Sequence, residues 1–134
     1  WAASSQKASG QTFNLTNGEV FSWRDMWPAI ADTLKVKVGA DEPQSVADYL
    51  NERVGLWPAI VSKYNLNESS LASILGESHY YADLCFAYGL SSSPPATFLS
   101  TVTIKQAGFS EVYDTEKSFC YWLRDLQRRK IVPD

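Results

Sequence analysis

The sequence has few of the side chains that most often bind metal ions or attack substrates. Its 134 residues include one histidine, one methionine and two cysteines. A protein metal site usually needs several histidine or cysteine ligands, and Cys85 and Cys120 fit neither a zinc spacing nor a CxxC motif. The sequence therefore predicts no metal site, and its two cysteines are expected as reduced thiols in a cytoplasmic protein.

Long apolar runs and a strong excess of charge are also missing. No stretch has the length and apolar character of a membrane helix, and no signal-peptide pattern is present. The net charge of −3 gives no reason to expect nucleic acid or an anionic membrane as a partner. With 45% apolar and 20% charged residues, the composition is typical of a soluble globular protein, expected as a single domain over residues 1–134.

The spacing of apolar residues predicts a mostly helical chain. Trp23 to Leu34 carries apolar residues three and four positions apart, behind a Ser22–Asp25 pair that resembles a capping box. Other capping or start signals predict further helices, which begin near Ser45, Pro58, Asn67, Ser78 and Thr115.

One segment has the alternation of a β-strand instead. Gln11 to Thr16 alternates polar with apolar residues and ends at the turn signal Asn17-Gly18. Residues 100–106 fit either a strand or a helix capped by Gly108. The expected fold class is therefore α/β, mostly helical, with one or two strands and about five helices. A single strand cannot satisfy its own backbone, so its sheet partner should come from a second copy or from another segment.

Five segments, in order along the chain, carry a family resemblance. The first is GQTFNLTNGEVFSWRDMWPAIADTLKV, at residues 10–36, and the others are at 56–66, 81–83, 100–109 and 114–133. Together they resemble the C-terminal, substrate-binding part of extended short-chain dehydrogenases/reductases. More narrowly, they are similar to the progesterone 5β-reductase and iridoid synthase-like group, including its fungal members. The resemblance covers essentially the whole chain.

The nucleotide-binding half of that family has no counterpart here. Its members begin with a glycine-rich GxxGxxG turn that holds the NADPH pyrophosphate, whereas the seven glycines of this chain are scattered. The catalytic tyrosine and lysine of the family also lie in that half. The resemblance therefore transfers no catalytic residue, and we expect no dinucleotide-binding domain and no cofactor.

The stretch HYYADLCFAYG, residues 79–89, contains most of the candidate site. On the helix expected there, four residues share one face: Tyr81, Leu84, Cys85 and Tyr88. The resemblance implies that this face borders the substrate pocket, where the two phenols could donate hydrogen bonds to a carbonyl. The alternative is a stripe that simply packs in the core.

His79 and Asp83 form a second candidate pair. They lie four residues apart, so the carboxylate could hold the imidazole in its charged form as a general acid. The alternative is a pair at the helix surface with no catalytic role. The candidate catalytic residues are thus His79, Tyr81, Asp83 and Tyr88.

Two aromatic residues outside this stretch are expected to line the same pocket. Trp57 lies at a Trp-Pro break before a helix, and Phe98 follows a serine- and proline-rich loop that could cover the pocket as a lid. By contrast, apolar stripes place Trp23, Trp27 and Trp122 in the core.

Three functions fit these residues. The first is a stand-alone pocket protein that binds or converts a hydrophobic, carbonyl-containing terpenoid or polyketide. As an enzyme without a cofactor it would act as an isomerase, dehydratase or cyclase. The second is the substrate-binding fragment of an NADPH-dependent enone reductase, and the third is a non-catalytic ligand carrier. The first two leave an apolar surface where a sheet would pack, and a free-standing protein is expected to cover it as a homodimer.

Overall fold

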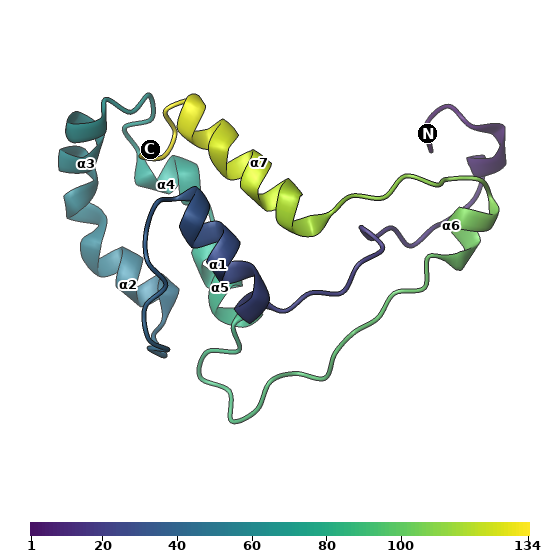
Figure 1. The fold of residues 1–134 in the computed structure, drawn as a ribbon, viewed down its shortest axis with the longest axis horizontal. Coiled ribbons are helices and arrows are strands. Elements are labelled where there is room, and N and C mark those ends of the chain that lie inside the picture. The colour runs from purple at the N-terminus through teal and green to yellow at the C-terminus, as the bar shows by residue number, and fades with distance from the viewer.

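The computed structural model describes residues 1–134 and contains helices but no β-strand. Seven α-helices and two short 3-10 helices follow one another along the chain (Figure 1). The α-helices are α1 (Trp23–Thr33), α2 (Val46–Arg53), α3 (Trp57–Tyr64), α4 (Leu71–Leu75), α5 (Ser78–Cys85), α6 (Val102–Gln106) and α7 (Thr115–Arg128). The 3-10 helices are η1 (Gln6–Ala8) and η2 (Val54–Leu56).

The helices divide into a helical group and an arm. In the helical group, α1 packs against α7 and α2 packs against α5. Figure 1 shows α6 and the N-terminal turn at some distance from this group, reached through three long segments without regular structure. These segments span residues 11–22, 90–101 and 109–114. We call α6, η1 and these connecting segments the arm.

Local sequence signals explain where most helices begin. The Ser22 hydroxyl accepts a hydrogen bond from the Asp25 N–H at 3.2 Å and donates one to the Asp25 carboxylate at 2.6 Å, which confirms the expected capping pair. The ambiguous segment around residues 100–106 is helical, as α6, and Gly108 follows it with a φ of +105°. The helix of residues 23–34 is confirmed as α1, which ends at Thr33.

Three expected caps are wrong by a few residues. Asp114, not Thr115, caps α7, because its carboxylate accepts from the Lys117 N–H at 2.9 Å. Ser70 caps α4, whereas the Asn67 side chain donates to the Arg129 carbonyl. Ser78 is already inside α5, which begins without a side-chain cap. For α7 and α4, an acceptor near the expected cap binds the N–H group instead.

The α/β expectation is wrong, because the expected strand does not form. Residues 11–16 have no regular structure, and the chain makes only 64 backbone–backbone hydrogen bonds. A folded protein of this length usually makes about 90. The physical reason is that a strand needs a neighbour, and nothing else in this chain adopts strand geometry beside it. Asn14 instead makes a single side-chain bond, to the Ser100 carbonyl at 3.2 Å.

The core is small for the length of the chain. Only 12 of 134 residues are buried, and the accessible surface is 10381 Å². A compact protein of 15.0 kDa usually exposes about 7,000 Å². The expected core positions of Trp27 and Trp122 are wrong, because these side chains are 42% and 57% exposed. At the α1–α7 contact Cys120 is buried instead, with its Sγ 3.8 Å from the Ala29 carbonyl oxygen.

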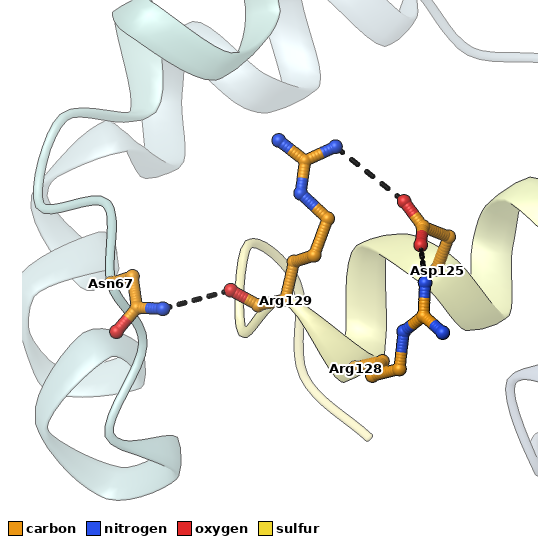
Figure 2. A network of polar contacts seen from close by, with 4 residues as sticks. All are labelled: Asn67, Asp125, Arg128 and Arg129. Carbon is orange, nitrogen blue, oxygen red and sulfur yellow. Dashed lines mark hydrogen bonds and ion pairs between the residues drawn. The ribbon is translucent and has the colours of Figure 1, made fainter.

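The end of α7 is tied to the loop between α3 and α4. Asn67 donates from its side chain to the Arg129 carbonyl at 2.9 Å, and its N–H donates to the Lys130 carbonyl at 2.8 Å. Figure 2 shows the adjoining network, in which the buried Asp125 carboxylate receives the guanidinium groups of Arg128 and Arg129. Asp125 therefore forms ion pairs with two of the basic residues at this end of the helix. None of the helices combines the length and the apolar character that a membrane span requires.

Candidate functional site

The helix α5 has one face against α2 and one face toward solvent. His79, Ala82 and Asp83 are partly buried, and the contact with α2 includes Asp83. The outer face carries the side chains that we expected to touch a ligand. Tyr81 is 66% exposed and Leu84 is 65% exposed, and Cys85 is exposed beside them.

Tyr88 lies beyond the end of α5 and belongs to a different surface. The helix ends at Cys85, and Ala87 then adopts a left-handed conformation with a φ of +56°. This turn directs the Tyr88 N–H to the Asp83 carbonyl at 2.9 Å. The Tyr88 side chain lines a depression of about 230 Å³ over α2, together with Asp48 and Tyr49. The two phenols of the expected pocket are therefore not neighbours on one helical face.

Asp83 caps the neighbouring helix α2. Its carboxylate accepts hydrogen bonds from the Ser45 hydroxyl at 2.6 Å, the Val46 N–H at 2.6 Å and the Ala47 N–H at 3.4 Å. The bond from Ser45 lowers the pKa of Asp83 below its usual value of 3.8, and the two N–H groups act in the same direction. These donors favour the charged carboxylate, which joins α5 to the positive end of α2.

His79 makes no hydrogen bond or ion pair with Asp83. Its ring lies against Tyr80, with 4.1 Å between the ring centroids, and its Nδ1 is buried without a hydrogen-bond partner. The Asp83 oxygens are directed at α2. The structure therefore does not form the His79–Asp83 pair that the spacing suggested.

The structure places the two remaining pocket candidates apart from each other. Trp57 is 9% exposed at the start of α3, with its Nε1 buried and unpaired. Phe98 is 72% exposed on the arm, where it lines a depression of about 270 Å³ with Thr16 and Lys105. Neither residue lies on the outer face of α5.

Two apolar features near α1 were not expected from the sequence. A groove of about 360 Å³ lies between α1 and the following residues 36–42, with Trp27, Ile30, Leu34 and Val38 among its lining residues. Beside it, aromatic rings from α1, α5 and α7 form a cluster that is open to solvent. The signal available in the sequence was the density of aromatic residues at positions 21, 23 and 27, of which we assigned Trp23 and Trp27 to packing.

Four of the helix N-termini do not fit the pyrophosphate of a dinucleotide, because side chains already occupy them. Such a site needs free backbone N–H groups beside glycines that let the phosphate approach closely. Here Ser22, Ser70 and Asp114 occupy the N-termini of their own helices, and Asp83 occupies that of α2. No group of three His, Cys, Asp or Glu side chains is close enough to hold a metal ion.

Comparison with known proteins identifies relatives along the entire chain. It is 30% identical over 138 residues to (S)-8-oxocitronellyl enol synthase CYC1 of Camptotheca acuminata, and 30% identical over 136 residues to (S)-8-oxocitronellyl enol synthase of Antirrhinum majus. The enzyme of that name from Catharanthus roseus is 28% identical over 138 residues. In each case the match covers 99% of this chain and 33% of the relative. No family model matches the chain.

The chain thus spans about a third of the length of the curated relatives it matches. The resemblance to the iridoid synthase-like group of extended short-chain dehydrogenases/reductases is confirmed by these relatives.

Proposed function

We propose that this chain forms the substrate-covering part of an enzyme for a hydrophobic, carbonyl-containing natural product. This natural product would be a terpenoid, and the rest of the catalytic site would come from a nucleotide-binding unit. The observation that carries the proposal is the similarity, over 99% of the chain, to a third of proteins named (S)-8-oxocitronellyl enol synthases. The name of these relatives refers to the chemistry of a terpenoid carbonyl compound.

The open geometry of α5 supports a site made of two parts. Binding sites for small molecules usually bury 70–90% of the ligand surface. Tyr81 and Leu84 are 66% and 65% exposed, so a ligand on this face would remain largely in water unless a second surface covered it. We therefore favour the two-part enzyme over a stand-alone isomerase, dehydratase or cyclase, and over a carrier, each of which would have to enclose the ligand with copies of this chain only.

The outer face of α5 can bind such a ligand through a hydrogen bond and apolar contacts. The Tyr81 hydroxyl can donate a hydrogen bond to a carbonyl oxygen, and Leu84 and Cys85 can contact its hydrocarbon part. Tyr81 is the preferred donor because Tyr88 is turned toward α2. This chain contributes binding and orientation, and the residues described here supply no cofactor step.

The proposal can be tested with a hybrid chain and the terpenoid aldehyde citral. In the hybrid, the two thirds of the Camptotheca relative outside the match precede Trp1. We expect the hybrid to bind citral at least tenfold more tightly than the 134-residue chain, measured by titration calorimetry. In the hybrid, Tyr81→Phe should weaken binding about fivefold to tenfold, the usual effect of losing one hydrogen bond.

The control is Tyr121→Phe, which alters an exposed tyrosine on α7 and should leave binding unchanged. Equal affinity of the hybrid and the 134-residue chain would contradict the two-part site and support a carrier. Conversion of citral by the 134-residue chain alone would instead support the stand-alone enzyme.

A further inference from the structure

We infer that Asn17-Gly18, in the first connecting segment of the arm, is a site of covalent modification by deamidation. The reacting groups are the side-chain amide of Asn17 and the backbone nitrogen of Gly18, and the only co-reactant is water. The modification would replace a neutral amide by a carboxylate at a point where the arm contacts α7. This inference is independent of the proposed function.

The reaction uses the peptide nitrogen that follows the asparagine. The Gly18 nitrogen attacks Cγ of Asn17, and the amide group takes up the Gly18 proton and leaves as ammonia. A five-membered succinimide ring remains, and water opens it at one of its two carbonyl groups. The product is aspartate or isoaspartate, in which the backbone runs through the former side chain. The sum is the hydrolysis of one amide, with no oxidation or reduction.

The backbone around Gly18 leaves this attack unobstructed. Gly18 has no Cβ, and its φ of +82° is one that other residues rarely adopt. Residues 11–17 have no regular structure and Asn17 is exposed, so water can reach the ring and no helical or strand bond fixes the backbone. Asn14 is also exposed in the same segment, but it precedes Leu15, whose side chain obstructs the equivalent attack.

Two hydrogen bonds slow the reaction in the folded chain. The Gly18 N–H donates to the Thr16 hydroxyl at 3.1 Å, which holds the proton that the attacking nitrogen must lose. The Asn17 amide donates to the hydroxyl of the buried Thr115 at 3.3 Å, which holds the amide against the start of α7. Each bond must weaken before the ring closes, so the loss of either one should accelerate deamidation.

The ammonium group of Lys105 acts in the opposite direction. Its Nζ lies 3.8 Å from the position that a Cβ on Gly18 would take, and both residues line the depression of about 270 Å³ on the arm. Ring closure places negative charge on the Gly18 nitrogen and then on the Asn17 carbonyl oxygen, and a nearby cation stabilises both. The other charged residue of this depression, Glu19, directs its carboxylate to the Thr115 N–H at 2.6 Å.

Deamidation would change the contact between the arm and α7. The donor from Asn17 to Thr115 would be lost, because a carboxylate only accepts hydrogen bonds. The new charge would also join three carboxylates at the start of α7, those of Glu19, Asp114 and Glu116. The modification would therefore act where the arm is attached to the helical group.

The site can be tested by incubating the 134-residue chain at mildly alkaline pH. Mass spectrometry of the tryptic peptide of residues 8–24 follows Asn14 and Asn17 in the same molecule. We expect Asn14 to be largely intact when half of Asn17 has lost its amide. Thr16→Val should accelerate the reaction of Asn17 about fivefold, the effect of one hydrogen bond. Lys105→Gln should slow it about twofold to fivefold, the effect of one exposed charge.

The matched control is Lys63→Gln, which removes an exposed lysine on α3 and should leave the rate unchanged. The opposite directions expected for Thr16→Val and Lys105→Gln separate the local chemistry from a loss of folding, which would change both rates in the same direction. Reaction of Asn17 no faster than that of Asn14 would overturn the site. Rates that neither variant alters, or that both variants raise, would overturn the roles of Thr16 and Lys105.

Discussion

Asp83 shows how one residue can carry a different role from the one its spacing suggests. Four residues after the only histidine, it had the position of a catalytic partner for His79. The structure instead directs both of its oxygens to the start of α2, where the Ser45 hydroxyl and two N–H groups bind them. No feature of the local sequence identifies Ser45 as the partner, because the contact joins positions that are 38 residues apart.

Acid should weaken this link. The pKa of Asp83 is lowered in the folded protein relative to 3.8, so its contribution to stability is complete above that value and is lost as the pH falls through the folded pKa. We expect Asp83→Asn to reduce the free energy of unfolding at neutral pH, and the difference from the wild type to shrink below pH 3.8. Urea unfolding followed by circular dichroism at a series of pH values measures this difference.

The control for this measurement is Ser62→Ala, an exposed change on α3 without a titrating group. Its difference from the wild type should not depend on pH. A constant difference for Asp83→Asn down to the lowest pH at which the chain folds would contradict the role of the charged carboxylate.

At the scale of the element, the helices with strong local signals were predictable and the strand was not. The capping pair Ser22–Asp25 and the apolar spacing behind it determine α1 with little help from the rest of the chain. A strand has no comparable local bonds, since its backbone must pair with a neighbour. Residues 11–16 have the alternation of a strand, yet they remain unpaired because no neighbour is present.

The end of α5 offers a test of how its turn is stabilised. Ala87 has a φ of +56°, a conformation that costs a residue with a Cβ roughly 1–2 kcal/mol. Glycine avoids this cost but loses about 0.5–1 kcal/mol through its greater freedom in the unfolded chain. We expect Ala87→Gly to raise the free energy of unfolding by up to about 1 kcal/mol in urea unfolding.

Ala82→Gly is the matched control, because it makes the same change inside α5. There glycine should lower the stability by about 1 kcal/mol. If both variants were destabilised equally, the left-handed conformation assigned to Ala87 would be contradicted.

At the scale of the whole molecule, the chain is open and its own helices leave many large apolar side chains uncovered. Trp27, Phe86 and Trp122 are exposed although their residue types favour burial. The arm contains its own small contact between the rings of Trp1, Phe13 and Phe109, with centroid separations of 5.9 and 5.4 Å. These rings join Trp1 to two of the connecting segments of the arm.

Small-angle X-ray scattering can test this open shape. A compact protein of 134 residues has a radius of gyration of about 14 Å. We expect a clearly larger value for the chain at low concentration, because the arm extends from the helical group (Figure 1). A value near that of a compact protein would show that the arm folds back onto the helical group. The expected homodimer stays a prediction that the same concentration series measures.

The sequence by itself determined the elements whose interactions are local. These are the capped and periodic helices, the break at Trp57-Pro58 and the family resemblance carried by short segments in order. Only the tertiary structure decided which partner each side chain meets: Asp83 with α2, Tyr88 away from Tyr81, and Trp27 at an open surface. The physical reason is the range of the interactions along the sequence. Caps and helical spacing act within a few residues, whereas burial and strand pairing depend on segments that are distant in the chain.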